Sequence, residues 1–302
     1  MAEMVAIAES VDAVVCQTPV EAAVRELRLI DAHQPPYNRR SKYPERSVWL
    51  KLTVEPFPRL SVVSTEKPDG ASYVGPFRSR RSAPRTAEAV YRSVPLRQCT
   101  GRLRVAPSAS ACVLADLGRC GAPCIGAETR EEYAAHVDTL QRALRGDISD
   151  LLGGCEQQMA RLVSQQRYEE AAAERDRIEA LTTSVHRTQS LSAFARIAEL
   201  VAAQRADGGG WDIVVVRHGR LAAAGRSAPG THPQPTVDAL LASAESVSPR
   251  PAPMPAATPE EAGILMRWLA QDGTRLVATS HPWALPRRTG RVECPAQAHG
   301  VP

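Results

Sequence analysis

The sequence predicts a helix-rich α+β fold built from small modules. Of its 302 residues, 43% are hydrophobic but only 4% are aromatic, so the chain can form cores that contain few large rings. Its 24 prolines fall mostly outside the stretches with helical periodicity. We therefore expect helical modules joined by proline-rich connectors, with fewer strands than helices, in a chain long enough for two or three domains.

Nothing in the sequence indicates a membrane-spanning or secreted protein. It contains no run of 18 apolar residues, and residues 1–15 carry three acids and no positively charged start. We expect a cytoplasmic protein with no membrane partner. Disulfides do not persist in that reducing compartment, so the seven cysteines are interpreted as ligands or buried thiols.

The first predicted helix lies near the N-terminus. Residues 11–16 have the composition of a short strand, and Thr18 and Glu21 then have the spacing of a capping box. The helix that follows is expected to end near His33, before two prolines. Its apolar stripe begins at Val20.

Hydrophobic periodicity predicts the remaining elements. The predicted strands are residues 48–54, 59–64, 211–217, 220–224 and 275–279. The predicted helices are residues 82–93, 130–145, 156–187, 190–204, 236–244 and 259–271. Glycines 208–210 are interpreted as a linker, and His218-Gly219 as the turn of a hairpin.

Four cysteines are the most concentrated group of potential metal ligands. Cys99, Cys112, Cys120 and Cys124 have the spacing C-x12-C-x7-C-x3-C in an irregular, glycine-rich stretch. Flexible backbone and four thiols suit a tetrathiolate site, and the spacing fits zinc as well as an iron–sulfur cluster. Four unrelated buried thiols are the alternative. The cysteines interpreted as non-ligands are Cys16, Cys155 and Cys294.

Arginines are concentrated in one region of an otherwise weakly charged chain. The formal net charge is only +4, but eight arginines and a single acid, Glu88, occur between residues 78 and 104. Arginine binds phosphate through two parallel hydrogen bonds, so this density favours DNA binding, with a solvated basic face as the alternative. The arginines are Arg78, Arg80, Arg81, Arg85, Arg92, Arg97, Arg102 and Arg104.

Residues 159–181 have an apolar stripe opposite a charged face, which predicts an amphipathic helix pair. Within them, Tyr-Glu-Glu-Ala-Ala-x-x-Arg-Asp-x-Ile resembles the UVR motif shared by UvrB and UvrC. This resemblance implies an antiparallel helical hairpin that packs against its counterpart on UvrB. The residues expected to bind that partner are Leu162, Tyr168, Ala171, Ala172, Arg175, Asp176 and Ile178.

Two further segments resemble UvrC. The sequence around the four cysteines, Pro-Leu-Arg-x-Cys-Thr and Gly-Arg-Cys-x-Ala-Pro-Cys, is similar to the UvrC segment that binds an iron–sulfur cluster. This resemblance, more than the spacing, favours [4Fe-4S] over zinc at Cys99, Cys112, Cys120 and Cys124. Residues 73–77, Tyr-Val-Gly-Pro-Phe, resemble the UvrC linker region.

Residues 26–38 resemble the end of the GIY-YIG nuclease domain of UvrC. The resemblance implies that Glu26 binds Mg²⁺ and that Asn38 supports the site, although a lone glutamate on such a helix is usually only solvated. The family's Gly-Ile-Tyr and Tyr-Ile-Gly strands and helix arginine do not occur in this sequence. We therefore expect an N-terminally truncated chain that is incomplete for catalysis, with the apolar stripe of its first helix partly uncovered.

The resemblance implies a nucleotide excision repair protein that incises damaged DNA together with UvrB. The alternatives are a non-catalytic adaptor that binds DNA and UvrB, and a gene fragment. Residues 39–46 and 209–221 look more like actinobacterial fusions of a DEDD exonuclease to a UvrC-like half, which adds an upstream exonuclease domain or chain as a possible partner.

The expected organisation has seven consecutive parts. In order, they are part of a GIY-YIG domain (1–57), a cysteine-bearing linker (58–126), a helical connector (127–155), the UVR hairpin (156–190), a helix and linker (191–207), a small α/β unit of unknown role (208–286) and a tail (287–302).

Overall fold

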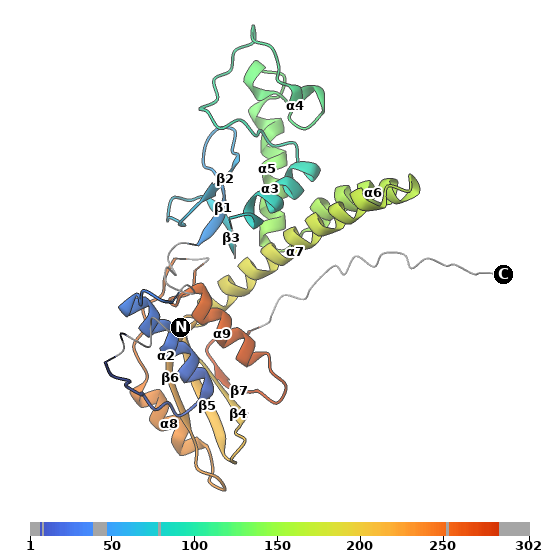
Figure 1. Ribbon diagram of the computed structural model, residues 1–302. Helices are drawn as coiled ribbons and strands as arrows, with labels where there is room; N and C mark the ends of the chain where they lie inside the picture. The colour runs from blue at the N-terminus through green and yellow to red at the C-terminus, as the bar shows by residue number, and fades with distance from the viewer. Residues whose placement is uncertain (1–6, 8, 39–46, 78–79, 252–253, 284–302) are drawn as a thin grey trace, which may run out of the picture. The chain divides into compact units, whose positions relative to one another are not determined.

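The computed structural model describes residues 7, 9–38, 47–77, 80–251 and 254–283 (Figure 1). Residues 39–46, the expected tail 287–302 and Cys294 lie outside these described residues. The chain divides into two compact units, one of residues 47–189 and one that combines residues 1–46 with residues 190–285. The expected organisation was consecutive along the chain, whereas the structure groups its first helix with its last strands. No helix among the described residues has the length and apolar character needed to cross a membrane.

The unit of residues 47–189 contains a three-stranded antiparallel sheet in the order β2-β1-β3. Its strands are β1 (Val48–Leu52), β2 (Leu60–Val63) and β3 (Ser72–Phe77). Its helices are α3 (Ser82–Ser93), α4 (Val113–Asp116), the 3-10 helix η1 (Pro123–Ile125), α5 (Arg130–Arg145), α6 (Ser149–Ser164) and most of α7 (Tyr168–Arg196). Apart from β3, η1 and the four-residue α4, these elements were predicted from periodicity, with one difference. The single helix expected at 156–187 is divided into α6, which begins at Ser149, and α7, which continues without a break to Arg196.

One hydrophobic core joins the sheet of this unit to α3, α5, α6 and α7. It includes Leu50, Tyr133, Leu151 and Ile178, each less than 3% exposed. Burying a side chain of this size contributes about 1.5–3 kcal/mol, so the core fixes the base of every feature that the unit carries. Cys155 lies in this core, which agrees with its interpretation as a non-ligand.

Gly75 ties β3 to α7 within the same unit. Its φ of +140° and its closeness to the Trp49 ring, 3.0 Å from where a Cβ would stand, leave no room for a side chain. Its N–H donates to the buried Thr188 Oγ1 of α7 at 2.8 Å. The Tyr-Val-Gly-Pro-Phe segment therefore joins the sheet to the long helix.

The second unit contains a four-stranded antiparallel sheet in the order β6-β5-β4-β7. Its strands are β4 (Leu200–Arg205), β5 (Trp211–Arg217), β6 (Arg220–Arg226) and β7 (Arg275–Thr279). Its helices are α2 (Pro19–His33), α8 (Gln234–Ser243) and α9 (Pro259–Leu269). Helices α2 and α9 share a core with one face of the sheet and α8 with the other.

The predicted β5–β6 hairpin is confirmed. His218 and Gly219 form its turn, with φ values of +50° and +76°. Both central residues of a type I′ turn need positive φ, which glycine adopts at no steric cost. The predicted helices near 236–244 and 259–271 and the strand at 275–279 are confirmed as α8, α9 and β7.

The predicted helix at 190–204 is wrong in its second half. Helix α7 ends at Arg196, and residues 200–205 form β4, which pairs with both β5 and β7. The alanines of this stretch favour a helix, but Leu200 and Ala202 pack on one face of the sheet while Val201 and Ala203 pack on the other. A strand buried on both faces has no polar alternation, so its pattern resembles that of a helix.

Two other expectations for this unit are wrong. Residues 208–210 are not a linker but lie in the tight turn between β4 and β5, where Gly209 and Gly210 have positive φ. Residues 11–16 form no strand among the described residues, because no neighbouring strand pairs with their backbone.

The apolar stripe of α2 is covered, contrary to expectation. Val20 and Val24 are buried in the core that α2 shares with β6 and α9. Arg28 of α2 forms a two-point ion pair with Glu261 of α9, with Nε–Oε2 and Nη2–Oε1 distances of 3.1 and 2.8 Å. Glu261 is only 2% exposed and also accepts the Leu221 N–H of β6 at 2.9 Å. This carboxylate joins α2, α9 and β6.

We predict that Arg28→Ala loosens the contact of α2 with β6 and α9. The change leaves a buried carboxylate without its cation, which costs about 1.5–3 kcal/mol. Amides of β6 and α9 should then exchange hydrogen about 10- to 100-fold faster, as measured by mass spectrometry. Arg25→Ala is the matched control, because Arg25 lies on the same helix and makes only an exposed 3.5 Å contact with Glu21. Equal exchange in the two variants would contradict this role of Arg28.

Candidate functional site

The four cysteines lie in an irregular stretch of the 47–189 unit. Cys112 is the N-cap of α4, Cys124 lies in η1, and Cys99 and Cys120 lie in irregular backbone. Ala122, with φ +55°, turns the chain between Cys120 and Cys124. The Cys124 carbonyl accepts the Ala106 N–H at 2.8 Å. This hydrogen bond joins the two arms of the stretch, the segment near Ala106 and the segment near Cys124.

The thiols of Cys99, Cys112 and Cys124 each lie within electrostatic reach of Cys120. Burial raises the pKa of the Cys120 thiol, and the thiols of Cys112, Cys99 and Cys124 raise it further. Among the described residues, no three His, Cys, Asp or Glu side chains already form a group that could hold a metal ion. Cys99 and Cys112 are exposed and the other two are half-buried, so all four thiols can be reached from solvent.

Arg97 lies in the interior, 1% exposed, two residues before Cys99. Its guanidinium donates to the carbonyls of Phe57 at 2.7 Å and Cys99 at 2.9 Å, and its Nη1 lies 3.2 Å from the Cys99 Sγ. A side chain so fully enclosed is not accessible to a DNA phosphate. Arg97 therefore leaves the set of expected DNA-binding arginines.

A second buried polar group lies beside the cysteines. The Glu128 carboxylate, 8% exposed, contacts His136 of α5 at 2.9 Å, and its Oε2 has no hydrogen-bond partner among the described residues. Burial raises the pKa of Glu128, and His136 opposes this rise. Glu128 also packs against Gly121, where a Cβ would lie 2.2 Å from the carboxylate. No local pattern in the sequence indicated this group.

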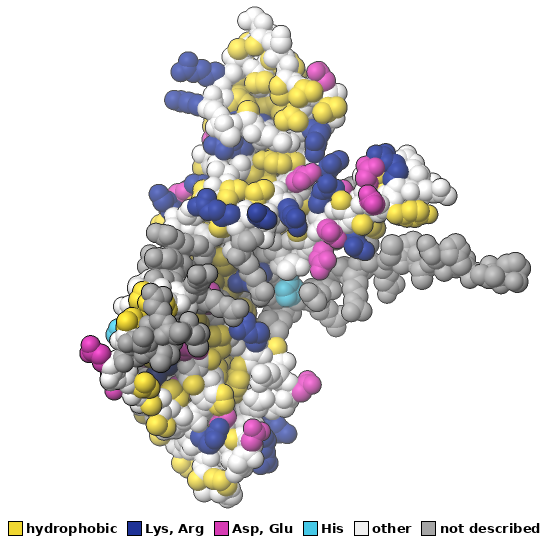
Figure 2. Space-filling model, in the orientation of Figure 1, with side chains coloured by type: hydrophobic (Ala, Val, Ile, Leu, Met, Phe, Trp, Pro, Cys, Tyr) yellow, Lys and Arg dark blue, Asp and Glu magenta, His cyan; other side chains and the backbone are white. Residues whose placement is uncertain are grey.

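The remaining arginines of the basic region fall into two sets. Arg81 is the N-cap of α3 and Arg85 lies in its first turn, which contains no acid. These two, with Arg80, Arg102 and Arg104, are exposed and form no ion pair with a described residue. By contrast, Arg92 pairs with Glu88 at 3.8 Å. Arg78 lies outside the described residues. Figure 2 shows dark-blue Lys and Arg side chains projecting from this unit.

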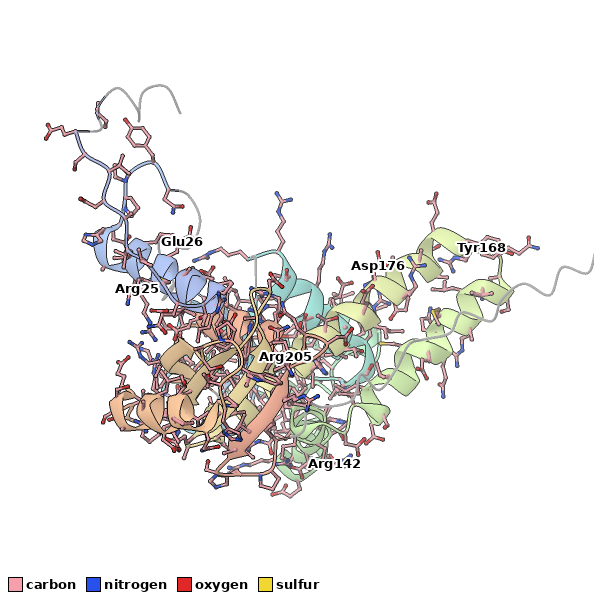
Figure 3. The ribbon with its side chains drawn as sticks, turned by 90° about the horizontal axis from the view of Figure 1, so that it is seen from below. Arg25, Glu26, Arg142, Tyr168, Asp176 and Arg205 are labelled. Carbon is pink, nitrogen blue, oxygen red and sulfur yellow. The ribbon has the colours of Figure 1, made fainter. Side chains whose placement is uncertain are left out.

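Helices α6 and α7 form the expected hairpin. Residues 165–167 connect them, with Gln166 in the left-handed region and the Arg167 N–H donating to the Leu162 carbonyl at 2.9 Å. Met159, Leu162 and Ala171 pack together near the tip. Figure 3 shows Tyr168 at the tip and Asp176 further along α7.

The structure divides the residues expected to bind the partner. Tyr168 is 57% exposed, and Arg175 and Asp176 are exposed and contact one another at 3.2 Å. Ala172, which lies between Tyr168 and Arg175 in the sequence, is half-buried. In contrast, Ile178 is 2% exposed and belongs to the core of its own unit, so it is not available to a partner. The other buried members of the set are Leu162 and Ala171.

Glu26 and Asn38 are not brought together in one site. Glu26 is exposed on α2 (Figure 3). It lines a hollow of about 390 Å³ together with Asp12, Cys16 and His33. Asn38 follows the helix in a turn, where its N–H donates to the Pro35 carbonyl, and it does not line the hollow. No tyrosine is among the described residues around the hollow.

Two family models match the unit that carries the cysteines and the hairpin. The UvrC/Cho excinuclease middle domain matches residues 47–143, and the UvrB/UvrC motif matches residues 149–183. Residues 47–143 thus match a UvrC-type middle domain, and a UVR motif follows it. In this segment the chain is similar to the UvrC family.

Curated proteins with similar sequences agree with these family matches. A Mycobacterium tuberculosis protein named as a bifunctional exonuclease/endonuclease is 43% identical over 93% of this chain and 43% of its own length. UvrABC system protein C of Methanosarcina acetivorans is 35% identical over 59% of this chain and 33% of its own length, and that of a Thermus thermophilus strain is 37% identical over 58% and 29%. The chain spans less than half the length of these relatives. No solved structure matches it.

Proposed function

We propose that this chain is a DNA- and UvrB-binding part of a UvrC-type protein of nucleotide excision repair. The observation that carries the proposal is the α6–α7 hairpin, which lies where the UvrB/UvrC motif matches and exposes Tyr168, Arg175 and Asp176 on one helix. The description of the motif names both UvrB and UvrC, and several relatives bear the name UvrABC system protein C.

The hairpin has the chemistry of a helix-docking surface. An exposed aromatic ring followed by a small residue allows a second helix to approach closely, and the adjacent charges of Arg175 and Asp176 select a partner of complementary charge. Ile178 and Leu181 anchor α7 in its own core, so the exposed part is held on a rigid base. Rigid presentation lowers the entropic cost of docking.

We predict that Tyr168→Ala weakens UvrB binding about tenfold or more in a calorimetric titration. Truncating an exposed aromatic residue at the centre of an interface typically costs more than about 1 kcal/mol. Ala172→Arg should abolish binding, because the larger side chain blocks close helix approach. Tyr37→Ala is the matched control, since Tyr37 is also exposed but lies in the other unit. Unchanged affinity in both hairpin variants would count against UvrB as the partner.

The DNA-binding surface is proposed at the start of α3. Arg80, Arg81 and Arg85 gather at the positive end of a helix whose first turn has no acid, which suits the phosphate backbone. Arg102 and Arg104 extend the positive charge into the stretch that carries the cysteines. Such contacts bind DNA with little sequence preference.

We predict that DNA binding by the chain weakens steeply with salt and that Arg81→Gln and Arg85→Gln each lower the slope of log K against log salt by about 1. Arg92→Gln is the control, because Arg92 lies on the same helix but pairs with Glu88. Fluorescence anisotropy with a labelled duplex between 50 and 200 mM salt, about the range over which such affinities fall by orders of magnitude, measures the slopes. Salt-independent binding would leave only a solvated basic face.

The four cysteines fit a tetrathiolate cofactor in the number and type of their donors. All four are thiols in one turn-rich stretch, and they already influence the pKa of Cys120. We propose that they bind a [4Fe-4S] cluster, with zinc as the competing occupant. When bound, either group would cross-link the two arms of the stretch beside the basic surface.

Incision is the second candidate function, and the site around Glu26 favours an adaptor role for the described residues instead. Hydrolysis of a phosphodiester needs an activator within hydrogen-bond reach of the nucleophile and a cation within reach of the scissile phosphate. Glu26 could supply one Mg²⁺ ligand, but among the described residues neither Asn38 nor a tyrosine lines its hollow. We infer that Mg²⁺-dependent cutting needs further groups, and that an exonuclease domain, as in the name of the mycobacterial relative, is a candidate partner.

A further inference from the structure

The two edges of the sheet in the second unit differ in how their backbone groups are used. At the β6 edge, the Leu221 carbonyl accepts a hydrogen bond from Arg28 Nη2 at 2.8 Å, and the Leu221 N–H donates to the Glu261 carboxylate at 2.9 Å. Further along the same strand, the Arg226 N–H donates to Gln17 Oε1 at 3.2 Å. Side chains from outside the sheet therefore close this edge against a further strand, as native sheets commonly do.

The β7 edge has no such cover among the described residues. Strand β7 pairs with β4 on one side, and no described residue hydrogen-bonds to the backbone groups on its other side (Figure 1). All five of its side chains are exposed, and the apolar Leu276 and Val277 are 48% and 45% exposed. The strand contains no proline, and its one charged residue is Arg275, at its start. An open and partly apolar edge is a template for one more strand.

Two exposed arginines lie beside one aromatic ring at the start of this edge strand. The guanidinium carbons of Arg205 in β4 and Arg275 in β7 are 4.6 and 5.7 Å from the centroid of the Trp211 ring. The strand register places these residues on one face of the sheet, because Trp211 is opposite Arg205 and Arg275 is opposite Ala203. Since the ring already holds both cations, ordering them costs an incoming anion little conformational entropy.

No acid among the described residues forms an ion pair with Arg205 or Arg275. Asp212 follows Trp211 in the sequence, but it lies on the opposite face of the sheet, where it pairs with Arg226 at 2.5 Å. Asp207 also acts on Arg226, whose pKa it raises. The face that carries Trp211 therefore presents two cations that an acid from outside the unit can pair with.

The geometry favours an extended acidic peptide as the occupant over DNA or a second copy of the chain. The β7 edge offers carbonyls as well as N–H groups, and carbonyls repel a phosphate but accept from the N–H groups of a peptide. Two β7 strands paired antiparallel about Val277 would place Thr279 opposite Arg275, which leaves both arginines without an acid.

The two faces of β7 differ in chemistry. Arg275 pairs with Ala203 and Leu276 with Ala202, and these alanines lie in the cores on opposite faces of the sheet. A strand in which acidic and apolar residues alternate would place its acids on the face of Arg275 and its apolar residues on the face of Leu276.

We propose that the β7 edge is a docking site for an extended segment of a partner protein, one in which acidic and apolar residues alternate and which joins the sheet as a further strand. Main-chain hydrogen bonds to β7 supply the affinity, and Arg205 and Arg275 on Trp211 supply the specificity for acids. The site lies in the second unit and does not depend on the surfaces proposed for DNA, UvrB or a cofactor.

The test is a fluorescence anisotropy titration of the full chain into a labelled peptide of alternating Glu and Val. Arg205→Gln and Arg275→Gln should each weaken binding about fivefold, the effect of losing one surface ion pair. Arg267→Gln is the matched control and should leave binding unchanged, because Arg267 is an exposed arginine of the same unit on α9. The bound peptide should also slow hydrogen exchange at the amides of β7.

Backbone methylation of the peptide separates strand addition from simple attraction between charges. Of two peptides methylated at alternate nitrogens, only the one whose methyl groups face β7 should lose binding, because both keep their charges. No binding of the Glu-Val peptide, or equal binding of all three peptides, would overturn the proposal. Slower exchange of β7 with oligothymidine in place of the peptide would reassign the edge to nucleic acid. The same protection in a chain that sediments as a dimer would reassign it to a second copy, and either result also overturns the proposal.

Discussion

The enclosure of one arginine side chain is the constraint on which the 47–189 unit depends. Arg97 has almost no access to solvent, so each of its donors needs an acceptor within the protein. Its guanidinium donates to the Phe57 carbonyl in the β1–β2 loop and to the Cys99 carbonyl, and it also lies beside the Cys99 sulfur. Tyr133 completes the arrangement through its edge-on contact with Phe57, at a centroid distance of 5.3 Å. The irregular stretch that carries the cysteines has little regular structure of its own, so this buried group supplies the order that its backbone lacks.

The same core positions the other two candidate surfaces of the unit. Helix α3 buries Ala83, Ala87 and Val90 in it, which leaves the arginines at the start of the helix to face solvent. Helix α7 buries Ile178 and Leu181 in it, while Tyr168 and Arg175 remain exposed nearer the tip of the hairpin. The sites proposed for a cofactor, DNA and a partner therefore share one folded base. The second unit, organised around Glu261, forms a separate base for α2.

Much of this organisation could be predicted from the sequence because it depends on local patterns. The spacing of Thr18 and Glu21 predicted a capped helix start, and His218-Gly219 predicted a tight hairpin turn. Long-range contacts left no such pattern. Arg97 was grouped with its arginine neighbours because nothing local shows that Glu55 and Phe57 enclose it, and Ile178 belongs to a motif whose sequence does not tell a core position from a docking position. The strand at 200–205 was missed because burial on both faces removes polar alternation.

The proposals for the 47–189 unit converge on one metal-binding centre, formed by the four cysteines above a preorganised base. X-ray absorption at the iron and zinc edges of the anaerobically purified chain would detect this centre. We predict iron with sulfur-only ligation at about 2.3 Å, lost when Cys120 is replaced by Ser and retained when the buried Cys155 is replaced by Ala. Zinc with four sulfur neighbours would keep the site but change its occupant. Absence of any bound metal, or a first shell made of nitrogen and oxygen, would contradict a four-cysteine centre.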